Sequence, residues 1–335
     1  METSSPEQIL SEVFGKYGLD LAILNRYKES HRFYHNIDHI YYMLRIASEY
    51  GLISDDLVLA IAFHDIICDP QRSDNEERSA GLCDVALKHS SLDVKRISTI
   101  ADAILDTKTH EHYSSELSKI LCDLDLHNLY GSYSVYYDSL YRVFKEYQYV
   151  DFKAFIEGRT KILKNYGVSE ERIEILQTFK PKIGVFAGSF NPFHKGHYNI
   201  LLKAERIFDK VIIARGINLD KYSDTEYCND NQINTNYKKK QLGFPEVAMN
   251  RQIAVYSGLL TDFIDGLGYD VTLIRGLRNA TDLQYESTQY QYLKDMKPDI
   301  NVVNIFCDKE YEHISSSAIK SLSKYDSRLV NKYLP

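Results

Sequence analysis

The sequence predicts two domains of different class, an all-α first half and a second half built around a parallel α/β sheet. Three observations lead to this prediction. A chain of 335 residues with 44% hydrophobic residues is long enough for two cores of ordinary size. The first half shows no convincing strand-like alternation, and its apolar residues recur at helical spacing. The second half alternates apolar runs with helical stretches, which is typical of a parallel sheet covered by helices.

A helix-breaking segment separates the two halves. Ser169 is a plausible N-cap, with Glu170 and Glu171 in the first helical turn after it. The helical pattern then stops at residues 178–182, where a proline disfavours helix in the residue before it. We therefore expect one domain over 1–179 and a second over 180–335.

The first half opens a helix that carries two histidines. Apolar residues recur with helical period in and after the segment 33–40. His35 and His39 are four residues apart, so a continuing helix places them on one face.

Two later helices add a histidine and carboxylates. The apolar run 57–63 ends in His64-Asp65, and a further helix holds Asp123 and Asp125. Burying an adjacent histidine and aspartate on a helix costs free energy unless a cation pairs with them. Imidazole and carboxylate together suit Mn²⁺, Fe²⁺, Ni²⁺ or Zn²⁺, whereas carboxylate with water suits Mg²⁺. We therefore predict a divalent metal site in this half.

Five motifs of the first half occur in a characteristic order. They are Tyr34-His35-Asn36-x-x-His39, Phe63-His64-Asp65, the segment 74–80, Asp123-x-Asp125-Leu126 and Phe155-x-x-Gly158-Arg159. Over roughly residues 5–176 this set resembles a family of predicted HD-domain metal phosphohydrolases. The resemblance implies an all-α HD-domain helical bundle that hydrolyses a small nucleotide-like phosphoester. The first motif is also similar to cyclic-nucleotide phosphodiesterases.

The HD resemblance also implies a role for each polar residue. The implied metal ligands are His39, His64, Asp65 and Asp125, with Asp123 as a competitor for the last position. The implied general acid is His35, and the metal would generate hydroxide from a bound water. His110 and Glu76 could face the pocket and bind substrate or a second metal, although His110 taken alone is also an ordinary polar residue. A non-catalytic nucleotide-binding regulatory module remains the alternative for this half.

The second half begins with a strand, a glycine turn and a helix. The apolar run 183–187 precedes the turn 188–197, and an amphipathic run follows over 198–208. Backbone N–H groups and a helix N-terminus meet at such a turn, which makes it a candidate phosphate site. His194 and His197 stand where the helix begins.

Three further apolar runs complete the predicted sheet, at 210–215, 270–274 and 301–306. Arg275-Gly-Leu-Arg278 follows the second of these runs directly, and three serines at 315–317 come after the last. In parallel sheets, ligands bind at the carboxyl ends of the strands. We therefore expect these segments to converge on one site.

The turn and the two later motifs resemble known nucleotidyltransferases. His194-x-Gly-His197 matches the HxGH signature of that superfamily. The ordered trio is Gly188 to His197, then Arg275-Gly-Leu-Arg278 with Asp282 to Glu286, then Ile314 to Ser317. Over 182–335 this trio is similar to phosphopantetheine adenylyltransferase. The resemblance implies a Rossmann-like fold that transfers AMP from ATP, with Mg²⁺, to a small phosphorylated acceptor and releases pyrophosphate. The first expected acceptor is 4′-phosphopantetheine.

The same resemblance assigns the site residues. His197, Lys221 and Arg275 would be catalytic, with Lys221 and Arg275 at the acceptor phosphate. The remaining residues would bind ATP or acceptor, and they are Gly188, Ser189, Phe190, His194, Arg278, Glu286, Ser315, Ser316 and Ser317.

Two departures leave the acceptor open. Asn191 and Lys195 replace the usual family residues, and Asn-Pro-Phe-His-x-Gly-His leans toward nicotinate or nicotinamide mononucleotide adenylyltransferases. The stretch 222–245 has the composition of an insertion and follows Lys221, so it could overlie the acceptor. ATP and CTP both remain open as donors.

The net charge, the cysteine content and the apolar runs limit the classes of partner and the location that we expect for this protein. A net charge of −7 makes nucleic acid an improbable partner. Five scattered cysteines without a CxxC pair favour reduced thiols in a cytoplasmic protein. No apolar run is long enough to span a bilayer, so no membrane association is expected. The transferase relatives assemble as hexamers, which makes a homo-oligomer an expectation that an amino-terminal helical domain would oppose.

Overall fold

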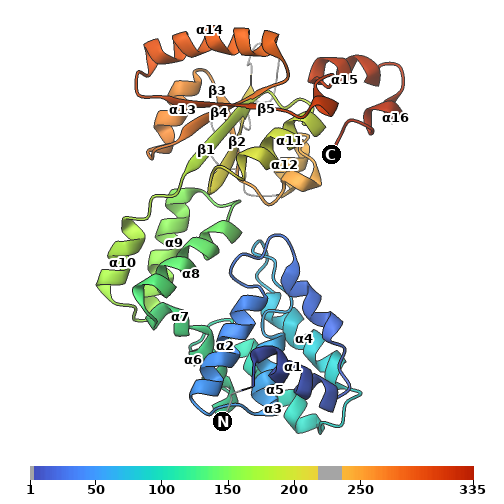
Figure 1. Cartoon of the computed structure of the whole chain (residues 1–335), viewed down its shortest axis with the longest axis vertical. Coiled ribbons are helices and arrows are strands. Elements are labelled where there is room, and N and C mark those ends of the chain that lie inside the picture. The colour runs from blue at the N-terminus through green and yellow to red at the C-terminus, as the bar shows by residue number, and fades with distance from the viewer. Residues whose placement is uncertain (1–3, 218–235) are drawn as a thin grey trace. The chain divides into compact units, whose positions relative to one another are not determined.

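The computed structural model describes residues 4–217 and 236–335, and its contacts divide the chain into two units (Figure 1). The first unit comprises Met1–Glu146 and Lys164–Ile175. The second comprises Tyr147–Leu163 and Leu176–Pro335. The sequence placed a single boundary at residue 179. The contacts instead assign an earlier segment, residues 147–163, to the second unit.

The first unit is helical throughout its described residues, as predicted. Its helices are α1 (Pro6–Lys16), α2 (Ile37–Glu49), α3 (Asp55–Phe63), α4 (Asn75–Leu87), α5 (Val94–Asp106), α6 (Glu116–Asp125), α7 (His127–Tyr130) and α8 (Tyr133–Glu146), with a 3₁₀ helix over Leu21–Lys28. Side-chain N-caps start several of them. Ser5 forms a capping box with Gln8, and Asn36 and Ser54 cap α2 and α3.

Helix α3 is the centre of this unit. Every residue from Leu57 to Phe63 is buried, so this helix has no solvent face. It contacts α1, α2, α4, α5 and α6, which surround it. The chain leaves this core at His64, the C-cap of α3, so the next polar residues emerge directly from the densest part of the unit.

Two helices connect the units along the chain, α9 (Phe152–Asn165) and α10 (Glu170–Gln177). The loop before α9 is fastened to the second unit by a buried lysine. Lys210 is 1% exposed, and its ammonium donates to the carbonyls of Gln148 and Val150. Tyr269 donates its hydroxyl proton to Asp151 at 2.9 Å. These contacts explain why the loop belongs to the second unit.

The second unit is a parallel sheet of five strands, which confirms the predicted fold class. The strands are β1 (Ile183–Gly188), β2 (Lys210–Ile217), β3 (Ile253–Ser257), β4 (Thr272–Leu277) and β5 (Asn301–Phe306), in the order β3-β2-β1-β4-β5. Each neighbouring pair is parallel. Strand β3 was not predicted from the sequence, because its apolar run is limited to the four residues 253–256.

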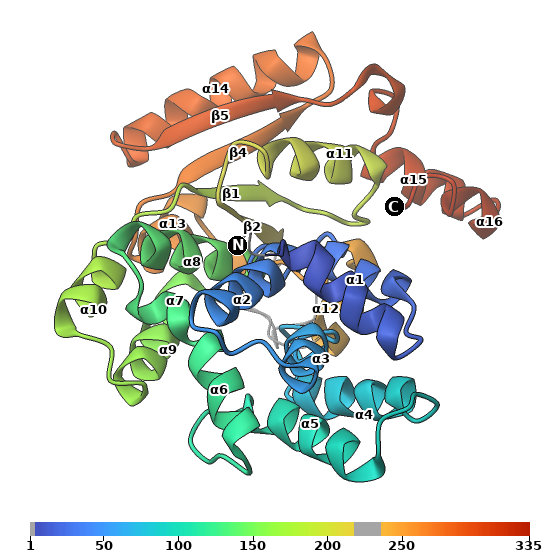
Figure 2. The same cartoon turned by 60° about the horizontal axis from the view of Figure 1, so that its bottom comes forward.

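Helices cover both faces of this sheet (Figure 2). Phe186 and Ile213 face α11 (Lys195–Ala204) and pack with its Ile200 and Leu201. The alternate residues of the same strands face α13 (Leu260–Leu267) and α14 (Ala280–Met296). The remaining helical elements are α12 (Asn236–Gln241), two 3₁₀ turns over Glu246–Ala248 and Lys309–Tyr311, α15 (Ser316–Ser323) and α16 (Ser327–Val330). None of the helices in the described ranges has the length and apolar character needed to cross a membrane.

Candidate active sites

A cavity of about 370 Å³ lies at the carboxyl ends of β1 and β4. Segments far apart in the sequence line it, among them the turn after β1, the residues around the end of β4, the first turns of α14 and the start of α15. The predicted site residues that line it are Gly188, Phe190, His194, His197, Arg275, Arg278, Glu286, Ser315 and Ser316. The structure therefore brings most of the predicted set together.

Two of the described predicted residues are not in this lining. Ser189 and Ser317 are exposed and do not line the cavity. Lys221 lies outside the described residues. Asp282, Tyr285 and Cys307 line the cavity as well, although none was singled out as a site residue from the sequence.

The two histidines of the turn are locked against each other. The backbone N–H of His197 donates to Nδ1 of His194, and the N–H of His194 donates to Nδ1 of His197, both at 3.3 Å. Their rings stack with centroids 3.6 Å apart. Since a backbone amide only donates, each Nδ1 must be an acceptor, and in the neutral ring the proton sits on Nε2. Both side chains therefore keep a donor on Nε2.

Burial keeps these histidines uncharged. Desolvation, with a contribution from Arg278, lowers the pKa of His194 to about 4. Desolvation also holds the pKa of His197 well below its usual value, and His194 and Arg278 act in the same direction. From the sequence, the two histidines are candidate phosphate contacts. The structure makes them neutral donors near pH 7, so among the described lining residues the positive charge comes from arginine.

The two arginines are held by carboxylates. Arg278 makes a bidentate pair with Asp282, at 2.8 and 2.9 Å, and Asp282 also accepts the backbone N–H of Arg278. Nε of Arg275 lies 3.1 Å from a carboxylate oxygen of Glu286. Fork-shaped guanidinium groups fixed in this way are suited to bind phosphate oxygens.

Two helices begin beside the cavity. His194 is the N-cap of α11, and Ser315 is the N-cap of α15, where its hydroxyl accepts the N–H of Ala318 at 3.1 Å. The N–H groups of Lys195 and His197 in the first turn of α11 already donate to Tyr333 and His194, and the dipole of this helix favours an anion at its start. Helix termini, two Nε2–H donors and two arginines thus form a site suited to a polyphosphate.

Comparison with known proteins agrees with this geometry. Residues 185–322 match the cytidylyltransferase-like family. A phosphopantetheine adenylyltransferase of Cytophaga hutchinsonii is 37% identical over 156 residues, which are 46% of this chain and 97% of the relative. One from Mycoplasma capricolum is 35% identical over 144 residues, which cover 43% of this chain and 98% of the relative.

Through its second half, this chain belongs to the phosphopantetheine adenylyltransferase family. Another member, from Streptococcus pneumoniae, is 35% identical over 144 residues and is covered over 85% of its length. The adenylyltransferase match thus spans a nearly complete relative and makes the second unit a nucleotidyltransferase domain. Each of these relatives corresponds to less than half of this chain.

A second polar cluster lies in the helical first unit. Ligand atoms of His39, His64, Asp65 and Asp125 all lie within 4.8 Å of one another. His39 comes from the start of α2, His64 and Asp65 from the end of α3, and Asp125 from the end of α6. Asp123 is instead on the outer side of α6, where it pairs with Lys119 at 2.7 Å. Asp123 is therefore not part of the cluster.

The donor atoms of this cluster fit a divalent metal. His64 is 1% exposed, and its Nδ1 donates to the carbonyl of Ile61 at 2.9 Å, which leaves the Nε2 lone pair facing the cluster. This Nε2 is buried without a hydrogen-bond partner in the described chain and lies 3.0 Å from Asp65. Burial lowers the pKa of His64, but Asp65 and Asp125 outweigh it and raise the pKa to about 9. Two carboxylates here demand a cation, either a proton or a metal.

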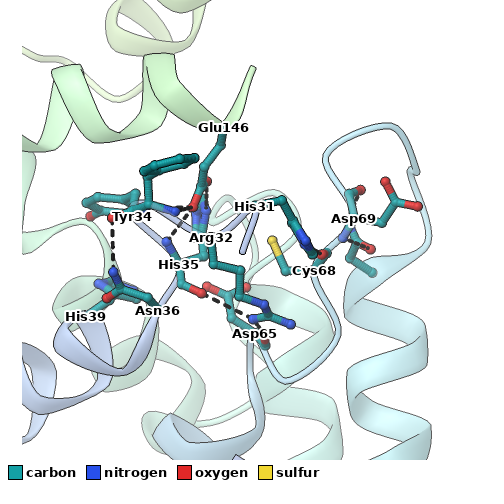
Figure 3. A network of polar contacts seen from close by, with 12 residues as sticks. His31, Arg32, Tyr34, His35, Asn36, His39, Asp65, Cys68, Asp69 and Glu146 are labelled. Carbon is teal, nitrogen blue, oxygen red and sulfur yellow. Dashed lines mark hydrogen bonds and ion pairs between the residues drawn. The ribbon is translucent and has the colours of Figure 1, made fainter. Parts of the chain in front are cut away.

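The candidate general acid is held by a carboxylate that the sequence did not reveal (Figure 3). Glu146, the last residue of α8, accepts the backbone N–H groups of Phe33, Tyr34 and His35 at 2.9, 2.7 and 2.8 Å. Its other oxygen accepts the Nδ1 proton of His35. Burial lowers the pKa of His35, yet Glu146 and Asp65 raise it well above its usual value. His35 is therefore held in its proton-donating form, with its ring centroid 6.1 Å from that of His39.

Arg32 makes hydrogen bonds that connect the segment around His35 to the segment around Asp65. Its guanidinium donates to the carbonyls of Asp65 at 2.6 Å and Ile66 at 3.0 Å, and it also reaches the carbonyl of His35 (Figure 3). Arg32 is 6% exposed. No spacing rule links Arg32 or Glu146 to the histidine motifs, so sequence reasoning had no signal for either residue.

The two remaining sequence candidates differ in their surroundings. Nε2 of His110 lies 2.9 Å from Oδ2 of Asp125, so His110 touches the cluster. Glu76 is half-buried in the first turn of α4, where burial, together with the charge of Asp65, raises its pKa. Glu76 is not among the four clustered residues.

Proposed function

We propose that the second unit transfers AMP from ATP to a small phosphorylated acceptor, with 4′-phosphopantetheine as the first candidate. The observation that supports this most is the convergence of His194, His197, Arg275 and Arg278 on one cavity. Membership of the phosphopantetheine adenylyltransferase family supports the same reaction and the same acceptor.

The chemistry requires little acid–base work. An oxygen of the acceptor phosphate attacks the α-phosphorus of ATP, the bond from that phosphorus to the β-phosphate oxygen breaks, and pyrophosphate leaves. The nucleophile is already anionic, so no proton has to be removed. Positioning and stabilisation of charge carry most of the rate in such transfers.

The described residues divide these tasks. Nε2–H of His197 donates to the triphosphate, the dipole of α11 favours its negative charge, and Arg278 neutralises charge there. Arg275 binds the acceptor phosphate, and Lys221 is proposed to act beside it. Mg²⁺, which such transferases use with ATP, would neutralise phosphate charge.

Pyrophosphate release from the full-length protein tests this proposal. ATP, Mg²⁺ and 4′-phosphopantetheine should give pyrophosphate and dephospho-coenzyme A. Nicotinamide mononucleotide is the control acceptor, because the Asn191-to-His197 segment resembles adenylyltransferases for that substrate. Release with the mononucleotide alone would reassign the acceptor, and CTP in place of ATP tests the donor.

We further propose that the first unit is an HD-type, metal-dependent phosphohydrolase for a small nucleotide-like phosphoester. The clustering of His39, His64, Asp65 and Asp125 carries this proposal. These residues would hold the metal, which would supply an activated water. His35, kept protonated by Glu146, would deliver a proton to the leaving oxygen.

Metal analysis and a hydrolysis screen test the second proposal. The purified full-length protein should contain a divalent metal and release phosphate or a nucleoside from a panel of nucleotides. Bound metal without turnover would favour the alternative of a regulatory nucleotide-binding module. A protein that takes up no Mn²⁺, Fe²⁺, Ni²⁺, Zn²⁺ or Mg²⁺ would refute the metal site.

A further inference from the structure

His110 holds one of the clustered carboxylates from outside the cluster. Its Nε2 is 2.9 Å from Oδ2 of Asp125, whereas Nε2 of His39 is 3.0 Å from Oδ1. An ionised carboxylate only accepts hydrogen bonds, so Nε2 of His110 must carry the proton. The two oxygens of Asp125 therefore have different partners.

The backbone at His110 is unusual. Its φ is 55°, in the left-handed region that few residues other than glycine adopt. Such a conformation persists only where surrounding contacts enforce it, and it is often associated with function. The imidazole side chain is 8% exposed, so this conformation directs a polar ring into the protein.

The loop that carries His110 is fastened at several points. The Asp106 carboxylate accepts the N–H of Ser114 at 2.8 Å and the hydroxyl proton of Ser118 at 2.6 Å. Nδ1 of His110 lies 3.4 Å from the hydroxyl of Tyr166, and the two rings meet edge to face. The ring is thus held from both sides, with one nitrogen toward Tyr166 and the other toward Asp125.

We propose that His110 is a positioning residue that holds Asp125 through Oδ2, so that Oδ1 is presented to the metal. This inference rests on the proposed metal-dependent function of the first unit. Asp65 lies in the same cluster and repels the Asp125 carboxylate when no cation is bound. The Nε2–H donor of His110 opposes that repulsion. His110 is not among the four residues whose ligand atoms cluster, so we place it beside the ligand set and not in it.

Titration of the metal-stripped full-length protein with Mn²⁺ tests this role, with free Mn²⁺ followed by electron paramagnetic resonance. The wild type should bind Mn²⁺. His110→Ala and His110→Gly should each weaken binding by about 10-fold to 100-fold, the usual effect of losing a partner of a metal ligand. His110→Gln, which retains an N–H donor at a similar reach, should recover most of the affinity. His112→Ala is the matched control, because His112 is exposed in the same loop.

The variants separate the imidazole from the backbone. Glycine adopts a positive φ without strain, so normal affinity in His110→Gly would show that backbone strain causes the loss in His110→Ala, and would overturn the proposal. Unchanged affinity in His110→Ala would overturn it as well. Melting of each metal-free variant reports whether the fold is intact. A wild type that binds no Mn²⁺ would instead refute the metal site itself.

Discussion

At the scale of single residues, the described lining of the second-unit cavity takes its uncharged hydrogen-bond donors from histidine and its positive charge from arginine. His194 and His197 are neutral donors fixed by each other's backbone, whereas Arg275 and Arg278 carry the positive charge. A neutral donor with a fixed tautomer needs no reorganisation when negative charge develops on phosphate.

The Nε2 donor of His197 should therefore matter mainly in the transition state. His197→Ala should lower kcat for pyrophosphate formation by about 10²-fold to 10³-fold, as the loss of one fixed donor does in comparable sites. KM for ATP should change much less. Steady-state kinetics measures both values, and exposed His89→Ala is the control. A rise of that size in KM for ATP, with kcat unchanged, would instead assign His197 to binding of the ground state.

The depressed pKa values of these histidines also predict a pH dependence of stability. The folded state holds His194 neutral down to a pKa of about 4, whereas an unfolded histidine takes up a proton near 6.5. Between these values the unfolded state binds more protons, so the second unit should lose stability as the pH falls from 6.5 toward 4. Hydrogen exchange of β1 and α11 peptides at pH 7.5 and 5 measures this loss. His194→Asn/His197→Asn should reduce it, and an undiminished loss in that variant would argue against the assignment.

Glu146 predicts a pH effect on the proposed hydrolase. Glu146→Gln keeps an oxygen for the three backbone N–H groups but removes the charge that raises the pKa of His35. A general acid must be protonated, so the alkaline limb of the pH–rate profile should move to lower pH. Profiles of phosphoester hydrolysis between pH 5 and 10 check this, with pyrophosphate formation as the internal control. An unmoved limb would remove His35 from the acid role.

At the scale of elements, three helix ends build the polar cluster of the first unit and two strand ends build the cavity of the second. Helix α3 illustrates the reason, because its seven buried residues force the chain to emerge only at His64. In the second unit, the carboxyl ends of β1 and β4 release the glycine turn and Arg275 at the same edge of the sheet. Polar residues at element ends can meet while the element interiors remain apolar.

The loop before α9 provides a test at this scale. Burial lowers the pKa of Lys210 to about 7, yet its amine donates to the carbonyls of Gln148 and Val150. Lys210→Met should leave those acceptors short of a donor and lower the free energy of unfolding of the second unit by roughly 1–3 kcal/mol. Urea denaturation measures this, with exposed Lys324→Met as the control. Equal stability of both variants would mean that the loop is held by its other contacts.

At the scale of the whole molecule, two candidate sites with different residue types lie in two separately packed units. Each has its own core, and the proposed ligands and donors of one unit are not shared with the other. The proposed reactions should therefore be separable by single substitutions.

Crossed variants test that independence. Asp65→Asn should abolish metal uptake and phosphoester hydrolysis while pyrophosphate formation stays at the wild-type rate, because Asp65 lies in the first-unit cluster. His197→Ala should show the reverse. Parallel assays of both activities and of metal content on the two proteins are sufficient. A large fall in pyrophosphate formation in Asp65→Asn, with the fold intact by circular dichroism, would reveal coupling between the units.

Patterns that repeat over short distances were readable in the sequence. Helical spacing predicted the all-α half, alternating apolar runs predicted four of the strands, and ordered motifs predicted most of the cavity lining. In each case the physical signal, burial of one face or the tight turn at Gly188, is local to a few residues.

Tertiary structure alone decided which distant polar groups became partners. The HD resemblance left Asp123 as a competitor of Asp125, and the fold places only Asp125 in the cluster because the two point to different sides of α6. Glu146 reaches His35 across 111 residues of chain, and His110 reaches Asp125 from a strained loop. The spacing of residues along the chain does not indicate which distant group a carboxylate or imidazole will bind. Its hydrogen bond is set by how the helices pack, and that packing depends on the whole core.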